Sequence, residues 1–258
     1  MKVLILGCGW VGESFAEHMQ AKGAELWVTC RTPEKVKDFK DRGYHACLLD
    51  LDEQDERMDL PLDFDFVLNS VPATAKYSVD VLENRFRNLK KLLHHISYRK
   101  HIFLSSIGVY PDCDAVMDEN YTQHLNPRLR DAEVLLSTLP NTLIYRLGGL
   151  FGKNRIFAKY FSNKVCSTGA QLANFVHVDD VLQLLDLGFT HLDGGEIYNI
   201  VCPQHPTKED VVRASTAKYG YDLPSAFEPA DSFQKKVLST KISTALSYSF
   251  IYPSPLDF

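Results

Sequence analysis

The chain has 258 residues, 45% of them hydrophobic and 24% charged, with a formal net charge of −5 at pH 7. This apolar content suffices for a large core, whereas the net negative charge and the lack of a long basic run argue against nucleic acid as the main partner. The apolar runs are of strand length, and no signal-peptide-like segment precedes the first of them, so we expect neither a membrane span nor secretion.

The first strand and turn are predicted from the first dozen residues. The apolar run Val3–Leu6 is typical of a strand buried on both faces of a parallel sheet. It leads directly into Gly7-x-Gly9-x-x-Gly12, and helix-like sequence follows as far as Gly23. The order strand, turn, helix is the context in which this glycine pattern binds a dinucleotide.

Each glycine of the motif has an expected task. Gly7 permits the tight turn, Gly9 lets the backbone approach a pyrophosphate, and Gly12 lets the helix pack closely on the strand. Trp10 and Val11 complete the helix N-terminus, whose N–H groups and positive dipole end favour an anion. The alternative is a glycine turn without a ligand.

Strands and helices continue to alternate through the first 150 residues. Further strands are predicted at Glu25–Thr29, His45–Leu49, Asp65–Asn69, His101–Ser105 and Thr142–Leu147. Helices are predicted at Pro33–Arg42, Val79–Ile96 and Pro127–Leu136. The acidic segment Leu51–Leu62 reads as a surface loop. Six strands with intervening helices predict an α/β fold, a Rossmann-type doubly wound parallel sheet.

Beyond Gly152 the alternation loosens. The later elements that we expect are a short helix over Asn154–Phe161, a helix capped by Asp179 or Asp180 that runs to Gly188, a strand at Glu196–Val201, a helix over Thr207–Tyr219 with a capping box at its start, and a helix near Thr240–Leu246. We expect residues 1–152 to form the dinucleotide-binding domain. Residues 153–258 then form a small, mixed substrate lobe, with one or two segments returning to the sheet and substrate bound between the two parts.

The end of the second strand predicts the choice of cofactor. NAD-specific sites of this type place Asp or Glu there to bind the ribose 2′-hydroxyl, but this strand ends in Arg31 and Thr32. A guanidinium holds a 2′-phosphate in a bidentate manner, so the sequence favours NADP, with NAD as the alternative. An arginine that simply faces solvent is the competing interpretation.

Several patches together resemble the atypical and extended short-chain dehydrogenase/reductases, in particular the NAD(P)-dependent epimerase/dehydratase-like proteins. The patches that carry the resemblance are Gly7–Gly12, Phe103–Tyr110, Arg146–Gly152, Phe175–Asp180 and Ile197–Ile200.

The resemblance implies a role for particular residues. Ser106 falls where the family has its catalytic serine, whose hydroxyl would bond the reacting oxygen of a substrate; the competing interpretation is a serine that merely ends a strand. Cofactor contacts are implied for Asp50, Ser70, Val71, Pro72, Ser105, Gly148 and Gly149. Substrate contacts are implied for Phe151, Phe175 and His177.

The sequence departs from the family at its Tyr-x-x-x-Lys pair. Counting back from Glu133 puts Leu129 at the lysine and Leu125 at the tyrosine, and neither residue can transfer a proton. Tyr110, on the loop of Ser106, is the likeliest replacement phenol that the sequence offers, and Tyr121 is the second.

Six cysteines are scattered through the chain without a C-x-x-C pair. This pattern is typical of reduced core residues and not of a metal site or a disulfide framework. The cysteines are Cys8, Cys30, Cys47, Cys113, Cys166 and Cys202.

These observations predict a cytoplasmic, NADP-binding epimerase/dehydratase-like or reductase-like protein, a monomer or homodimer without a metal. Its substrate would be a nucleotide sugar or a similar small molecule. The main alternative is a non-catalytic module that binds NADP and reports the redox state to a partner. A methyltransferase, whose nucleotide loop is also glycine-rich, is a weaker third possibility.

Overall fold

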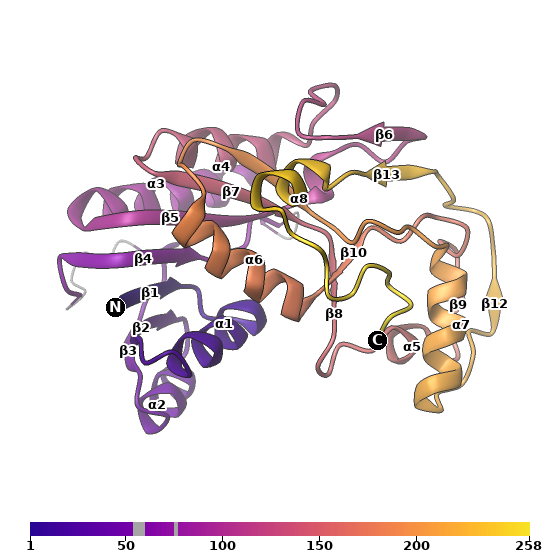
Figure 1. Cartoon of the computed structure of the whole chain (residues 1–258), viewed down its shortest axis with the longest axis horizontal. Helices are drawn as coiled ribbons and strands as arrows, with labels where there is room; N and C mark the ends of the chain where they lie inside the picture. Colours follow the sequence, from indigo (N-terminus) through magenta and orange to yellow (C-terminus); the bar gives the residue numbers. More distant parts are fainter. Residues whose placement is uncertain (54–59, 75–76) are drawn as a thin grey trace. The chain divides into compact units, whose positions relative to one another are not determined.

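The computed structural model describes residues 1–53, 60–74 and 77–258. The chain forms two compact units (Figure 1), and each is built from several segments. The first unit consists of Met1–Val109, Asn126–Tyr145 and Leu185–Ile197. The second unit consists of Tyr110–Leu125, Arg146–Leu184 and Tyr198–Phe258.

A seven-stranded parallel sheet has the order β11-β7-β5-β4-β1-β2-β3. Its strands are β1 (Lys2–Leu6), β2 (Glu25–Cys30), β3 (His45–Leu48), β4 (Asp63–Asn69), β5 (Ser97–Ser106), β7 (Thr142–Leu147) and β11 (Ile197–Ile200). The strand order reverses between β1 and β4, which makes the carboxyl ends of these two strands the expected ligand crevice of such a sheet.

Helices cover both faces of the sheet in the first unit. The helices are α1 (Trp10–Gln20), α2 (Pro33–Asp41), α3 (Val79–His95), α4 (Pro127–Ser137) and the end of α6 (Val178–His191). Leu4 and Leu6 of β1 join one core with α3 and α4, which lie side by side in Figure 1. On the other face Phe189 of α6 stacks on Phe66 of β4, with ring centroids 4.7 Å apart, and also contacts Phe15 of α1. The predicted doubly wound α/β class is therefore confirmed.

The second unit contains short parallel strand pairs, helices of its own and the start of α6. The pairs are β6 (Ala115–Met117) with β13 (Lys235–Val237), β8 (Gly149–Phe151) with β10 (Phe175–His177), and β9 (Val165–Cys166) with β12 (Ala226–Phe227). Its helices are α5 (Phe157–Phe161), α7 (Lys208–Tyr219) and α8 (Thr240–Leu246). The capping box predicted for α7 is present, formed by Thr207 and Asp210.

Most long elements lie where the sequence predicts them, although β5 begins at Ser97 instead of His101 and α6 ends at His191 instead of Gly188. The other differences fall on short segments. The two- and three-residue strands of the second unit were not predicted, because so few residues carry no periodicity. Helix α5 begins at Phe157 instead of Asn154. Of the predicted loop Leu51–Leu62, residues 54–59 lie outside the described residues.

Candidate functional site

The turn after β1 has the geometry that the glycine motif predicts. Gly7 adopts φ +71°, a left-handed conformation that glycine tolerates without strain. A Cβ on Gly7 would also lie 3.2 Å from the Val71 side chain. The turn is tied to the second strand because the N–H of Gly7 bonds the Thr29 hydroxyl at 2.9 Å and the N–H of Cys8 bonds the Thr29 carbonyl at 2.7 Å.

Helix α1 begins immediately after Gly9, which is its N-cap and has no side chain to satisfy the first-turn N–H groups. A Cβ built on Gly9 would meet only the Gly7 carbonyl oxygen, at 3.8 Å, so the space beside this helix end is open. Gly12, by contrast, is packed so closely that a Cβ would lie 3.0 Å from Ile5 of β1. Trp10 and Val11 form the rest of the first turn.

The first turn of α1 carries one carboxylate, Glu13, which is paired with Arg42 Nη1 at 2.5 Å. Burial raises the pKa of the Cys8 thiol to about 12, so the thiol stays neutral and adds no negative charge beside the helix N-terminus. The open space at Gly9, the dipole of α1 and the close packing at Gly12 are the features that fit a pyrophosphate.

The exit of β4 lies against the same turn. The N–H of Ser70 bonds the Leu6 carbonyl at 2.9 Å, and Val71 packs on Gly7. Asn69 is fully buried, and its Oδ1 accepts from the Val71 N–H at 3.2 Å. Its Nδ2 has no hydrogen-bond partner within the described part of the chain. Asn69 was not among the predicted site residues, since the sequence placed it only in a strand.

Arg31 follows β2 and is exposed, which fits both a residue that meets a ligand and an arginine that faces solvent. Its Nη1 donates to the hydroxyl of Tyr77 at 3.4 Å. Thr32 is the N-cap of α2, without a side-chain capping bond. Asp50 uses Oδ1 to accept from the Asp52 N–H at 3.0 Å, so it shapes the turn after β3.

Arg85 is the largest omission from the predicted site. It lies on α3, is 3% exposed and holds Asp52 in a bidentate pair at 2.8 and 2.6 Å. Its Nη1 also donates to the Pro72 carbonyl at 3.2 Å. The sequence did carry a signal, because a charged residue between Leu82 and Leu89 on a buried stripe requires a partner.

The two serines at the end of β5 differ. Ser105 is buried and donates to Glu133 of α4 at 2.7 Å, so its hydroxyl is occupied by a carboxylate that is itself fully buried. Ser106 is half-buried, and its Oγ accepts from the N–H of Gly108 at 3.1 Å. Across residues 1–53, 60–74 and 77–258, no acceptor is found for the Ser106 hydroxyl proton. Ser106 is therefore able to donate to a substrate oxygen.

Tyr110 lies in the second unit and has a different environment from the one that the sequence suggested. It is 2% exposed, and its hydroxyl oxygen accepts from Arg146 Nη1 at 2.8 Å. Asn199 Oδ1 at 2.8 Å and the Asp118 carbonyl at 2.9 Å are both within reach of its proton. Burial raises the pKa of Tyr110 above its usual value. These contacts argue against Tyr110 as a proton donor to substrate.

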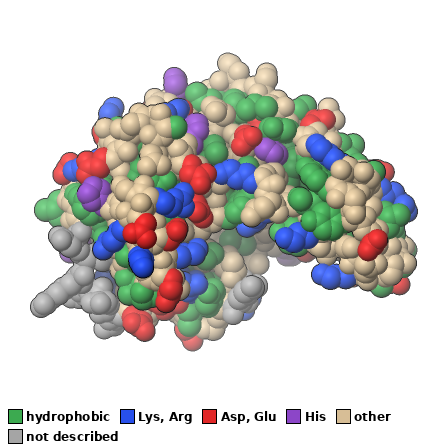
Figure 2. All heavy atoms as spheres, turned by 90° about the horizontal axis from the view of Figure 1, so that it is seen from below, with side chains coloured by type: hydrophobic (Ala, Val, Ile, Leu, Met, Phe, Trp, Pro, Cys, Tyr) green, Lys and Arg blue, Asp and Glu red, His purple; other side chains and the backbone are tan. Residues whose placement is uncertain are grey.

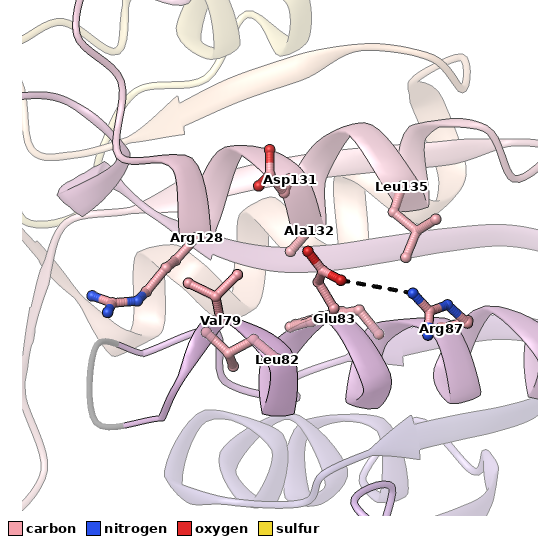
Figure 3. A pocket seen from close by; sticks show the side chains of 9 residues that line it. Val79, Leu82, Glu83, Arg87, Arg128, Asp131, Ala132 and Leu135 are labelled. Atoms are coloured by element: carbon pink, nitrogen blue, oxygen red, sulfur yellow. Dashed lines mark ion pairs between the residues drawn. The ribbon is translucent and has the colours of Figure 1, made fainter.

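Tyr121 and the expected Tyr-x-x-x-Lys positions are also visible. Tyr121 is half-buried and contacts the Tyr110 ring edge-on, with centroids 6.0 Å apart. Leu129, at the expected lysine position, is buried in α4. Arg128 lines a cavity of about 240 Å³ between α3 and α4, which Figure 3 shows together with the ion pair Glu83–Arg87.

The predicted substrate residues meet in the second unit. In the β8–β10 pair, Phe151 lies opposite His177 and Gly149 opposite Phe175. Phe151 is almost fully buried, with its ring edge-on to His177 at 5.0 Å. Close packing also explains why Gly148 and Gly149 have no side chain. A Cβ on Gly148 would lie 2.7 Å from the Asn174 carbonyl, and one on Gly149 would overlap the Phe175 ring.

The start of α6 corrects one prediction. The side chain that caps the helix is His177, whose Nδ1 accepts from the Asp179 N–H at 3.2 Å. Asp180 instead accepts from Tyr248 Oη and the Ile251 N–H, both at 2.7 Å. Asp180 thus ties the C-terminal segment to α6.

No group of three or more His, Cys, Asp or Glu side chains that could hold a metal occurs in the part of the chain that the structure describes. Within the same residues, no helix has the length and apolar content needed to cross a membrane. All six cysteines are described and none forms a disulfide. Acidic and basic side chains are intermixed on the face shown in Figure 2.

The fold and the glycine turn define an NAD(P)-binding protein of Rossmann type. Residues 3–130 match the model of the NAD dependent epimerase/dehydratase family. The resemblance to extended short-chain dehydrogenase/reductases is thereby confirmed.

Known proteins of similar sequence or structure cover nearly the whole chain. Protein YeeZ of Escherichia coli is 28% identical over 271 residues, which span 99% of this chain and 97% of YeeZ. Human epimerase family protein SDR39U1, solved with NADPH, has a TM-score of 0.73 and 16% identity, covering 100% of this chain and 97% of its own. UDP-glucuronic acid 4-epimerase of Bacillus cereus, solved with NAD and a UDP-sugar analogue, has a TM-score of 0.75 and 18% identity, covering 100% and 96%. At these sequence identities, the similarity of the two structures to this chain shows a common fold and no more.

Proposed function

We propose that the first unit binds NADP through the turn Gly7–Gly12 and through Arg31, and that the protein reduces, epimerises or dehydrates a nucleotide sugar or a similar small molecule. The observation that carries the proposal is the N-terminus of α1, where Gly9 leaves open space and no capping side chain. A nicotinamide cofactor supplies hydride transfer when bound. SDR39U1 with NADPH and the Bacillus cereus epimerase with a UDP-sugar analogue support the two ligand classes.

In this proposal the second unit recognises substrate, with Phe175 and His177 as contact residues. Ser106 acts by donating its hydroxyl proton to the reacting oxygen, since its Oγ already accepts from Gly108 and its proton is available. Tyr121 is the preferred phenol because Tyr110 is buried and fully hydrogen-bonded. Leu129 cannot lower the pKa of a phenol as a lysine would, so we expect slow turnover.

A non-catalytic NADP-binding module is the second candidate function. The observation that favours it is the Tyr110 hydroxyl, which is held by Arg146 and Asn199 and not exposed to a ligand. In such a module Ser106→Ala would leave every measurable property of the protein unchanged except local stability.

The proposal is tested by cofactor binding and then by turnover. Purified protein is titrated with NADPH while its fluorescence is followed, and S-adenosylmethionine is added as a competitor. We expect NADPH binding that S-adenosylmethionine does not displace. Mass spectrometry of small molecules released on denaturation then identifies any retained ligand.

Turnover of a hydroxyl or keto substrate that falls about a hundredfold in Ser106→Ala would support the enzyme. Cofactor binding together with turnover that is the same in wild type and Ser106→Ala would remove Ser106 from the mechanism. Absence of dinucleotide binding would contradict the proposal as a whole.

A further inference from the structure

Tyr77 lies between two arginines at the carboxyl edge of the sheet in the first unit. The Arg31 guanidinium donates to its hydroxyl at 3.4 Å. The Arg85 guanidinium carbon lies 3.9 Å from the centroid of its ring, a close cation–π contact. The same tyrosine therefore touches the exposed arginine after β2 and the buried arginine of α3.

Arg85 is a rigid support for this contact. Two of its nitrogens hold the Asp52 carboxylate after β3, and a third donates to the Pro72 carbonyl after β4. Its side chain is 4% exposed, so few alternative positions are open to it. By stacking on Arg85, the Tyr77 ring is fixed relative to the exits of β3 and β4, and its hydroxyl is held where Arg31 reaches it.

The hydroxyl of Tyr77 has donor capacity to spare. Its oxygen accepts from Arg31, and no acceptor for its proton is found among residues 1–53, 60–74 and 77–258. The two arginines and Asp52 leave one excess positive charge around it. Both arginines lower the pKa of Tyr77 through hydrogen bonding and charge, and Arg31 has the larger effect. The same positive charges favour the binding of an anion beside the Tyr77 hydroxyl.

We propose that Tyr77 is a specificity residue for the 2′-phosphate of NADP. Its hydroxyl donates to a phosphate oxygen that the Arg31 guanidinium also holds, and Arg85 keeps the tyrosine in position. A hydrogen bond to a charged phosphate is about twice as strong as one to a neutral ribose hydroxyl, so Tyr77 strengthens binding of the phosphorylated cofactor selectively. This inference rests on the proposed function and adds a second residue to the choice between NADP and NAD.

The test uses the full chain and two fragments that differ in one group. Dissociation constants of adenosine 2′,5′-bisphosphate (2′,5′-ADP) and of 5′-AMP, which lacks only the 2′-phosphate, are measured by calorimetry for wild type, Tyr77→Phe and Arg31→Ala. Tyr77→Phe keeps the ring on Arg85 and removes only the hydroxyl. Tyr160→Phe, at an exposed tyrosine of the second unit, is the matched control. NADPH and NADH are titrated in parallel.

We expect Tyr77→Phe to weaken 2′,5′-ADP and NADPH about tenfold and to change 5′-AMP and NADH less than twofold. Equal weakening of all four ligands would show that Tyr77 supports the fold and would overturn the inference. Unchanged affinities in Tyr77→Phe with a loss in Arg31→Ala would overturn the inference and leave the proposed function standing. A wild type that binds neither NADPH nor NADH would overturn both.

Discussion

The glycine turn of the first unit and the Tyr110 network of the second unit differ in how their polar groups are used. At the turn, Gly9 leaves open space at a helix N-terminus. Around Tyr110, the hydroxyl is enclosed by Arg146, Asn199 and the Asp118 carbonyl. A ligand gains only from groups that the protein has not already satisfied, so the turn is suited to binding and the network to stability.

The comparison would break if the Tyr110 network contributed little to folding. Arg146→Met removes the buried donor to Tyr110. We expect it to lower the free energy of unfolding by about 3 kcal/mol, because the buried Tyr110 hydroxyl oxygen loses its donor. Arg99→Met, at an exposed arginine of the first unit, should change it by less than about 0.5 kcal/mol. Urea unfolding of both variants measures the free energy of unfolding. An equally small decrease in the two variants would contradict a stabilising role of the Tyr110 network.

A carboxylate placed at Gly9 tests whether the N-terminus of α1 binds the cofactor. Gly9→Asp supplies a good N-cap for α1 and should preserve stability. The same carboxylate occupies the first-turn N–H groups and repels phosphate, so NADPH affinity should fall about a hundredfold, roughly 2.7 kcal/mol.

Gly9→Asn is the matched neutral control for this variant. It has the same size and capping ability without the charge, and should weaken NADPH less than Gly9→Asp does. NADPH affinity that is unchanged in Gly9→Asp would show that the helix N-terminus does not bind the cofactor.

His101 is an intermediate case, a buried group that is only half satisfied. Its Nδ1 lies 3.0 Å from the Thr142 hydroxyl, and its Nε2 has no partner among the described residues. Burial lowers the pKa of His101 from about 6.5 to about 3. The unfolded chain therefore binds a proton first, and the stability from neutral His101 is complete above about pH 6.5 and is lost as the pH falls toward 3.

At pH 5 this loss should reach about 2 kcal/mol relative to pH 7. Urea unfolding at the two pH values is compared for wild type, His101→Gln and His124→Gln, an exposed control. We expect a smaller pH effect only in His101→Gln. Burial also lowers the pKa of His205, to about 4, so part of the pH effect should remain in every variant.

Tyr110→Phe gives the smallest expected change and separates stability from chemistry. Removing the hydroxyl should cost about 1 kcal/mol of unfolding free energy and leave NADPH affinity unchanged. Tyr121→Phe should cost less, since Tyr121 is only half-buried. If turnover disappeared in Tyr110→Phe while stability stayed constant, Tyr110 would have to be returned to the mechanism.

The same contrast explains what the sequence could predict. The turn Gly7–Gly12 is local, so its spacing alone predicts the conformation of Gly7 and the close packing of Gly12 that the structure shows. The long strands and helices follow in the same way from periodicity. Side-chain environments depend on distant partners. The pairing of Tyr110 with Asn199, 89 residues later, leaves no local pattern.

Charged residues on buried stripes are a middle case. Arg85 could have been singled out from its position on α3, although Asp52, 33 residues earlier, could not have been named as its partner. The sequence favours Asp179 or Asp180 over His177 as the cap because Asp is the commoner cap, and this places the start of α6 two or three residues too late.

The central claim is that Arg31 and the glycine turn together make a site for NADP. The most direct test is the pair of dissociation constants for NADPH and NADH, measured for wild type and for Arg31→Ala. We expect wild type to prefer NADPH at least about tenfold, and Arg31→Ala to lose that preference while keeping its affinity for NADH. A wild type that prefers NADH, or an Arg31→Ala variant that binds NADPH as tightly as wild type, would contradict the claim.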